Sequence, residues 1–377
     1  MTRLTRIQAW ACRSPIHIPV ETSFGRMKDR PAVFLRIEDD SGAFGWGEIF
    51  ANWPASGAEH RVNLLAEDIA PMVIGHPLAP PESMFHDLEQ RTHIRALQCG
   101  EFGPFRQVLA GLDQAMWDML ARRADQPVQQ ALTGGQAKRV PAYASGIPIA
   151  AAPQMIARAR TDGFTRFKVK VGFGTSDEIE QVHRVHANLA PNETLMLDAN
   201  QAWTASQAAQ FLDQIADLPI GWLEEPIRAD CPDDDWRQLM GRIPLAGGEN
   251  IAGLTDFDAA LALGVLDVYQ PDIAKWGGFS GCLAVARRAL TQGHIYCPHF
   301  LGGGIGLAAS AQLLAAAGGP GMLEVDVNPN PLRDAFGPIA DQIENGFWKL
   351  RDAPGIGINA LPDAVLDLVT HYRELTA

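Results

Sequence analysis

The sequence predicts an α/β protein in which a barrel of parallel strands follows a smaller α+β region. Two observations carry this prediction. Through the middle of the chain, short apolar runs alternate with helical patterns, which is typical of βα units around a parallel sheet. Before residue 136 this alternation is absent. The length of 377 residues suits a barrel with one appended domain.

Residues 1–135 predict the smaller domain, with strands and helices of its own. The apolar runs 32–38 and 43–48 flank a polar turn and are typical of a β-hairpin. Apolar residues at helical spacing follow at 58–69 and 107–123. We therefore expect an α+β domain ahead of the barrel.

Residues 136–330 predict the barrel itself. Eight runs predict strands, at 140–146, 167–171, 194–200, 221–226, 244–250, 265–272, 294–299 and 321–326. Helical patterns fill the seven intervals between them. A barrel with eight strands and seven crossovers ends on a strand that has no regular helix behind it. Residues 331–377 are too few to fold alone, so we expect them to pack back on the first domain.

Composition excludes several classes of function. The formal net charge is −13, whereas a surface for nucleic acid or anionic membrane needs clustered lysine and arginine. The five cysteines include no CxxC pair, which favours a reducing compartment over a disulfide framework. The longest apolar stretch, 305–317, is too short to span a bilayer. We expect a cytoplasmic protein that binds neither nucleic acid nor membrane.

Nearly every predicted barrel strand ends on a charged or titratable residue. Active sites of βα barrels lie at the C-terminal ends of the strands, and charges buried within a parallel sheet need a reason. Scattered surface charge would not produce one such residue per βα unit at steps of 23 to 28 residues. The series is Lys170, Asp198, Glu224, Glu249, Asp272, His299 and Glu324.

Three successive members of this series are carboxylates. Asp198, Glu224 and Glu249 should converge, and three carboxylates without cysteine or histidine suit a hard cation such as Mg²⁺. Glu225 follows Glu224 and should point to the opposite face of its strand, where we expect it to pair with a basic group.

Two further pairs predict proton transfer. Lys168 and Lys170 are two residues apart and share a face, so each ammonium should lower the pKa of the other and favour a neutral base. Asp272 and His299 end neighbouring strands, and a carboxylate on one ring nitrogen makes the other a better base.

Taken together, these residues resemble the mandelate racemase branch of the enolase superfamily (mandelate racemase/muconate lactonizing enzyme-like). The motifs that carry the likeness are Gly45-Trp46-Gly47-Glu48, Lys168-Val-Lys170, Leu197-Asp198-Ala-Asn200, Leu223-Glu224-Glu225-Pro226, Gly248-Glu249-Asn250, Pro271-Asp272, Cys297-Pro-His299, Glu324 and Pro354-Gly355-Ile356-Gly357. They span most of the chain and are specific as a set.

The resemblance implies a (β/α)7β modified TIM barrel under an α+β capping domain built from residues 1–135 and 331–377. It implies one Mg²⁺ in each site, a small carboxylate substrate and a homo-oligomer, dimer or octamer. The implied roles are Asp198, Glu224 and Glu249 as metal ligands, Lys170 as base with Lys168 tuning it, His299 oriented by Asp272 on the opposite substrate face, Glu324 on a substrate carboxylate oxygen, and Asn200 on substrate.

Lys275, three residues after Asp272, is ambiguous within this resemblance. A lysine at this place is the opposing base in the muconate-lactonizing branch, but the His299–Asp272 pair makes it a supporting, substrate-binding residue here. Specificity lies in a capping loop, here 20–30, and in the segment 50–54. Within them, Phe24 and Trp53 would suit a less polar substrate, whereas basic residues of the loop would suit a second carboxylate or a polyol.

Two bases on opposite faces allow two reactions at the carbon next to a carboxylate. Dehydration of a hydroxy acid or acid sugar is the main expectation, and racemisation or epimerisation of an α-substituted carboxylate is the alternative. In both, metal and hydrogen-bond donors would stabilise an ene-diolate. A non-catalytic barrel that binds metal or ligand is a further alternative. A hydrolase barrel would favour histidine ligands, and no HxH or HExxH occurs.

Overall fold

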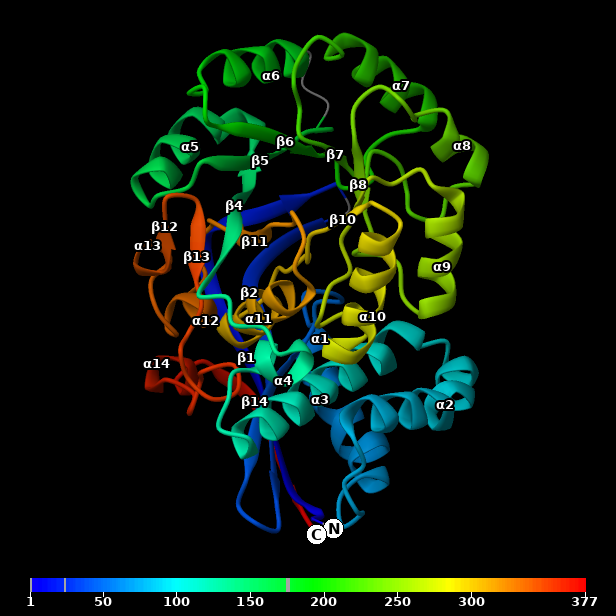
Figure 1. Ribbon diagram of the computed structural model, residues 1–377, viewed down its shortest axis with the longest axis vertical. Helices are drawn as coiled ribbons and strands as arrows, with labels where there is room; N and C mark the ends of the chain where they lie inside the picture. The colour runs from blue at the N-terminus through cyan, green and yellow to red at the C-terminus, as the bar shows by residue number, and fades with distance from the viewer. Residues whose placement is uncertain (1, 24, 174–176) are drawn as a thin grey trace.

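A computed structural model describes residues 2–23, 25–173 and 177–377. The barrel occupies the upper part of the long axis, and a domain of one sheet and several helices lies below it (Figure 1). Both termini lie side by side at the lower end, where Arg6 of the first strand pairs with Thr376 of the last.

The lower domain contains an antiparallel sheet in the order β14-β1-β2-β3. The expected hairpin at 32–48 is present as β2 and β3, and the tail strand β14 completes the sheet beside β1. The long first strand and the second helix were not expected from the sequence, because neither carries a clean apolar period. The elements are β1 (Leu4–Thr22), β2 (Gly25–Asp39), β3 (Phe44–Ile49), β14 (Val369–Thr376), α1 (Gly57–Leu64), the π-turn η1 (Leu65–Ile69), the 3-10 turn η2 (Ala70–Met72), α2 (Pro81–Cys99), α3 (Phe102–Arg123) and α4 (Val128–Thr133).

All eight expected barrel strands are present, and parallel pairing runs from β4 to β10 with β11 on the other side of β4. Most are shorter than expected because regular pairing covers only the middle of each run. The strands are β4 (Arg139–Pro148), β5 (Arg166–Lys170), β6 (Thr194–Asp198), β7 (Leu223–Glu224), β8 (Leu245–Gly247), β9 (Val268–Tyr269), β10 (Ile295–Tyr296) and β11 (Leu323–Asp326). Between them lie η3 (Ile149–Ala151), α5 (Ala152–Thr161), α6 (Glu178–Ala187), α7 (Ala205–Gln214), α8 (Asp233–Arg237), α9 (Leu254–Leu263), α10 (Gly278–Thr291) and α11 (Gly304–Ala317).

The barrel closes where β11 meets β10. A Cβ on Gly321 would collide with the carbonyl oxygen of Tyr296, so only glycine lets the two strand segments approach this closely. The Met322 N–H donates to Cys297 Sγ at 3.3 Å at the same junction. The last strand is therefore held between β10 and β4.

Along the barrel strands, a layer of mainly apolar side chains inside the barrel is followed by a layer of polar side chains at the C-terminal ends. Side chains two residues apart share a face of a strand. Tyr143, Met196, Trp222, Val268 and Cys297 pack together inside the barrel. The residues two positions further along these strands are Ser145, Asp198, Glu224, Gln270 and His299.

The lower domain is joined to the barrel through two buried carboxylates at helix N-termini. Glu48, at the end of β3, accepts the N–H groups of Gly303 and Gly306 at the start of α11, the second at 2.7 Å. Asp113 of α3 accepts Ser280 N–H at 3.0 Å and its hydroxyl at 2.6 Å on α10. Burial raises the pKa of Glu48 to about 7, against the lowering effect of the two glycine N–H donors.

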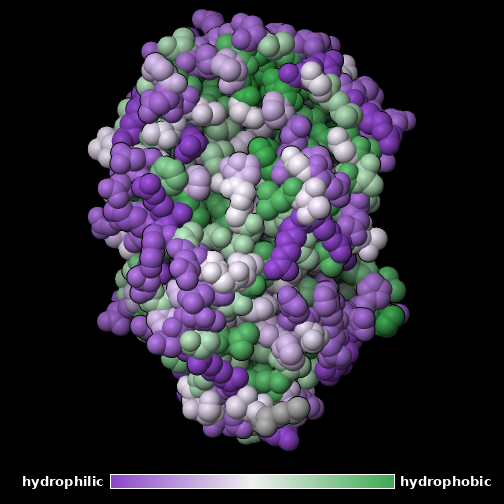
Figure 2. Space-filling model, in the orientation of Figure 1, coloured by the Kyte–Doolittle hydropathy of each residue, from purple (hydrophilic) through white to green (hydrophobic). Residues whose placement is uncertain are grey.

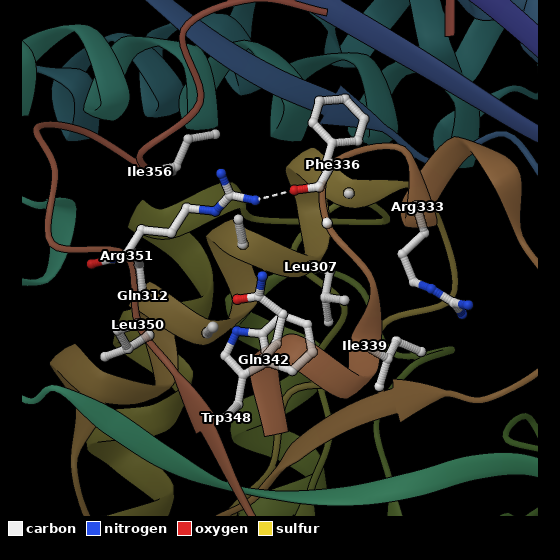
Figure 3. A pocket seen from close by; sticks show the side chains of 14 residues that line it. Leu307, Gln312, Arg333, Phe336, Ile339, Gln342, Trp348, Leu350, Arg351 and Ile356 are labelled. Atoms are coloured by element: carbon white, nitrogen blue, oxygen red, sulfur yellow. Dashed lines mark hydrogen bonds between the residues drawn. The ribbon is translucent and has the colours of Figure 1, made fainter. Parts of the chain in front are cut away.

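The C-terminal segment returns from the barrel to the lower domain along α11. It contains α12 (Pro331–Asp334), α13 (Ile339–Gln342), β12 (Ile343–Glu344), β13 (Phe347–Lys349), which pairs with β4, and α14 (Asp363–Leu366). Figure 3 shows Arg351 donating to the Phe336 carbonyl oxygen across this segment. The crevice beside it measures about 20 Å³ and has room for little more than a water molecule.

The outer helices of the barrel carry mainly hydrophilic residues, and hydrophobic ones show chiefly in the recesses between elements (Figure 2). Within the described part of the chain, no helix combines the length and apolar character needed to cross a membrane.

Replacing Glu48 with alanine should lower the stability of the protein. The buried N–H groups of Gly303 and Gly306 would lose their acceptor, which costs about 1–3 kcal/mol for each group. Urea unfolding followed by tryptophan fluorescence measures the change. Glu38→Ala, at a partly exposed pair with Arg36, is the control and should change little. Equal effects of both substitutions would contradict the capping role of Glu48.

Candidate active site

The structure brings most of the predicted site residues together at the C-terminal ends of the strands. At its centre, Lys168 Nζ lies 2.6 Å from Glu224 Oε1 and 2.7 Å from Glu324 Oε1. Asp198 Oδ2 lies 3.8 Å from the same nitrogen. All four side chains are almost fully buried, so Lys168 is the cation that holds these carboxylates in one place.

The expected lowering of the Lys168 pKa is wrong in this structure. Burial by itself would lower it, but the charges of Glu224 and Glu324 outweigh burial and hold the pKa well above its ordinary value. The expectation rested on the one neighbouring lysine, whereas the carboxylates around this ammonium outnumber that lysine. Burial raises the pKa of Glu224 to about 7, with Lys168 opposing that shift.

Lys170 extends beyond Lys168 toward the mouth of the barrel. Its Nζ lies 3.5 Å from Asp198 Oδ2 and also contacts Asn200 Oδ1. Asn200 is fixed in turn, because its N–H donates to Asp198 Oδ1 at 2.9 Å. Ser23, from the loop before β2, donates its hydroxyl to the Asn200 carbonyl oxygen. The capping domain therefore reaches the site at the substrate-binding position predicted for Asn200.

His299 has both ring nitrogens engaged by carboxylates. Nδ1 lies 2.7 Å from Asp272 Oδ2, the contact expected between neighbouring strand ends. Nε2 lies 2.7 Å from Glu249 Oε2 and 3.9 Å from Glu324 Oε2. Burial lowers the imidazole pKa, but the charges of Glu249 and Glu324 and the Asp272 hydrogen bond outweigh it and raise the pKa well above its ordinary value.

Glu225 points away from the site, as expected, but its partner differs from the expectation. Both its oxygens accept Asn250 Nδ2 at 2.9 Å, in place of a basic group. Asn250 Oδ1 accepts Lys275 Nζ at 2.8 Å, and Lys275 lies 3.6 Å from Glu249 Oε2. Lys275 therefore stands at the edge of the same cluster, and its ammonium lies 5.1 Å from the centre of the Phe50 ring.

Two residues of the site were missed from the sequence. Gln270 donates Nε2 to Glu224 Oε2 at 2.7 Å, and its own Oε1 is buried without a hydrogen-bond partner. Ser145 donates its hydroxyl to Glu324 Oε1 at 2.5 Å. Gln270 lies two residues before Asp272 and so shares its strand face. This spacing is the sequence feature that could have identified Gln270 as a site residue. Ser145 belongs to the first barrel strand, where no charged residue drew attention.

Of the two predicted specificity residues, Trp53 is described by the structure and Phe24 is not. A Cβ on Gly25 would lie 2.6 Å from the Trp53 ring, so the capping loop and the segment 50–54 touch. Arg61 supports this segment by donating to the Trp53 carbonyl oxygen at 3.1 Å. Phe24 lies outside the described residues. Substrate contact by Trp53 and Phe24 stays a prediction.

The donor set fits a hard cation by chemistry, although the carboxylates are engaged with protein cations. No three histidine, cysteine, aspartate or glutamate side chains of the described chain are grouped as a metal site. Glu249 contacts His299, whereas Glu224 contacts Lys168. Carboxylate oxygens, the donors that a hard cation prefers, gather here beside lysine and histidine.

Comparisons with known proteins cover nearly the whole chain. The family model for "Mandelate racemase / muconate lactonizing enzyme, N-terminal domain" matches residues 5–134, and "Enolase C-terminal domain-like" matches residues 151–364. D-galactarolactone cycloisomerase of Agrobacterium fabrum is 28% identical, over 97% of this chain and 98% of its own. Arabinonate dehydratase of Saccharolobus solfataricus is 27% identical, over 86% of this chain and 87% of its own.

Solved structures show the same fold. A mandelate racemase/muconate lactonizing enzyme from Bordetella bronchiseptica is 44% identical with a TM-score of 0.90, covering 96% of this chain and 99% of its own. An enolase from Bradyrhizobium, complexed with magnesium and mandelic acid, is 27% identical with a TM-score of 0.83, covering 98% and 99%.

Replacing Lys168 with methionine should destabilise the protein in a pH-dependent way. Removing the buried ammonium takes from Glu224 and Glu324 the cation that contacts both most closely, a loss of about 3–5 kcal/mol near pH 8. The carboxyl pKa values in the folded variant then lie above their unfolded values, so stability is greatest at low pH and falls as pH rises. Urea unfolding at pH 5 and pH 8 measures this. Lys138→Met, at an exposed pair, should change neither value appreciably.

Proposed function

The chain belongs to the mandelate racemase/muconate lactonizing enzyme family of the enolase superfamily, and we propose that it dehydrates a hydroxy acid, most simply an acid sugar. Its family members are enzymes, and the relatives above include a cycloisomerase and a dehydratase named for sugar acids or their lactones. One observation carries the chemistry with two proton carriers, and the dehydratase among the relatives favours dehydration. Lys170 on β5 and His299 after β10 face one buried carboxylate cluster from well-separated positions around the barrel, as two proton carriers on opposite substrate faces require.

In this reaction Lys170 takes the proton from the carbon next to the substrate carboxylate. His299 gives its Nε2 proton to the hydroxyl on the following carbon, which leaves as water. The resulting enol becomes a 2-keto acid, so atoms and charge balance. Asp272 holds Nδ1 and thereby turns Nε2 toward the site, and Glu324 would bind a substrate carboxylate oxygen.

Asp198, Glu224 and Glu249 would hold one Mg²⁺. When bound, the ion would stabilise the second negative charge that develops as the α-proton leaves. Glu249 would have to release His299 to join the other two ligands, which would also free Nε2 for substrate. Gln270 would orient Glu224 from behind. The magnesium in the Bradyrhizobium relative supports this assignment for the family.

Racemisation is the second candidate, because the same two groups serve it. His299 would return the proton to the opposite face of the same carbon, in place of protonating a leaving hydroxyl. Asn200, Lys275 and Trp53 would then set which substrate is accepted in either case. We further infer a cytoplasmic homo-oligomer, from the cysteine usage and the family resemblance.

The test is NMR of acid sugars and smaller α-hydroxy acids incubated with the Mg²⁺-loaded protein in D₂O. Dehydration gives a new keto acid, whereas racemisation removes the α-proton signal without a new product. Lys170→Ala and His299→Asn should each lower kcat by about 10²–10⁴-fold, since each removes one proton carrier. Turnover that survives in both variants would refute the assignment of the two groups.

Removal of Mg²⁺ should abolish turnover and lower thermal stability. With EDTA, the unfolding temperature should drop and return on adding Mg²⁺, because the ion stabilises only the folded state. Glu249→Gln should reduce this Mg²⁺-dependent shift, since it removes one of three anionic ligands. Glu344→Gln, at an exposed pair far along the chain, serves as control. An unchanged shift in Glu249→Gln would exclude Glu249 as a ligand.

A further inference from the structure

Glu225 is a buried carboxylate that the proposed reaction does not use. It is 2% exposed and faces a cavity of about 400 Å³ between the strands and helices α8 and α9. Within residues 2–23, 25–173 and 177–377, no lysine, arginine or histidine is in ion-pair contact with it, and the hydrogen bonds of its carboxylate are with Asn250. A buried carboxylate without a direct ion pair costs free energy, so its position calls for a reason.

The contact of Glu225 with Asn250 fixes which way the Asn250 amide faces. A carboxylate accepts hydrogen bonds and donates none, so it binds the NH₂ end of an amide. Both Glu225 oxygens lie 2.9 Å from Asn250 Nδ2, and Glu249 Oε1 lies 3.2 Å from the same nitrogen. The carbonyl end, Oδ1, is thereby turned toward Lys275 Nζ at 2.8 Å.

Lys275 is held at the outer edge of the site by these contacts. Its side chain is 18% exposed, against 12% for Lys170 and 1% for Lys168. Its ammonium has three N–H donors, of which one is used by Asn250, and the Glu249 oxygen at 3.6 Å is too distant for a second good hydrogen bond. Two donors therefore remain for a ligand.

We propose that Glu225 and Asn250 are positioning residues that fix the Lys275 ammonium, so that it binds acceptor oxygens of the substrate remote from the reacting carbon. The positioning rests on the contacts above. What Lys275 binds rests on the function proposed above. Phe50 contributes from the capping domain, because its N–H donates to the Ala274 carbonyl oxygen at 3.2 Å and its ring lies 5.1 Å from the Lys275 ammonium.

Glu225→Gln tests the orientation with almost no change of shape. Glutamine can donate as well as accept, so the Asn250 amide is free to turn its NH₂ group toward Lys275 and withdraw the acceptor. The rate of Lys275 acetylation by acetic anhydride, read by mass spectrometry, should rise about 10-fold. Asp233→Asn, which removes a carboxylate from the same cavity without touching Asn250, should leave the rate unchanged.

The double variant Glu225→Gln/Asn250→Asp supplies the rescue. A glutamine at 225 can donate to one oxygen of an aspartate at 250, whose other oxygen accepts from Lys275. The contacts from position 225 through position 250 to Lys275 are then restored, with the negative charge at position 250 in place of 225. The slow acetylation rate of Lys275 should return. Asn250→Ala, which removes the link altogether, should raise the rate as Glu225→Gln does and covers the case in which that variant fails to fold.

Kinetics distinguish this proposal from the function it rests on. With a substrate identified by NMR, Glu225→Gln should raise KM about 10-fold with kcat nearly unchanged, Lys275→Ala should do the same, and the double variant should restore KM. Altered acetylation with no compound turned over would overturn the proposed function and leave the positioning standing. Unchanged acetylation in folded Glu225→Gln or Asn250→Ala, or no recovery in the double variant, would overturn the positioning.

Discussion

The balance of buried charge at the top of the barrel is the constraint on which the site depends. Asp198, Glu224 and Glu324 are almost fully buried, and a carboxylate out of water costs free energy unless positive charge or hydrogen-bond donors compensate it. Lys168 supplies that charge from β5, with contacts of 2.6 Å to Glu224 on β7 and 2.7 Å to Glu324 on β11. Lys168 is for this reason an integral part of the fold. If Lys168 is removed, the negative charges of the remaining carboxylates repel one another without compensation from its ammonium.

The same principle explains how the capping domain is docked. Its carboxylates Glu48 and Asp113 are buried against the N-termini of α11 and α10, where unpaired backbone N–H groups and the helix dipole favour negative charge. Glycines at 45 and 47 let β3 lie directly on α3, since any side chain there would strike its backbone. The loop that carries Ser23 and the segment that carries Phe50 and Trp53 are thereby held over the barrel. The docking of the two domains thus positions the segments that we expect to set substrate choice.

Much of the fold and the inner site could be predicted because parallel barrels impose two strict rules. Strand ends converge at one face, and residues two apart share a side of the strand. Lys170, Asp198, Glu224 and His299 follow from those rules and their charge alone. Gln270 and Ser145 obey the same rules but carry no charge, so they did not stand out. The second helix and the first strand were missed because their apolar spacing is irregular and tertiary packing determines them.

The sequence by itself determined the order of the barrel strands, the identity of the polar groups at their ends and the family to which the chain belongs. The tertiary structure decided how those groups are paired. Glu249 contacts His299, Glu225 turns the Asn250 amide toward Lys275, and Lys168 keeps its proton where the sequence alone suggested a loss. The physical reason is that pKa values and hydrogen-bond partners depend on distances between strands far apart in the chain. Periodicity specifies which side chains meet, whereas burial and geometry specify what they do to one another.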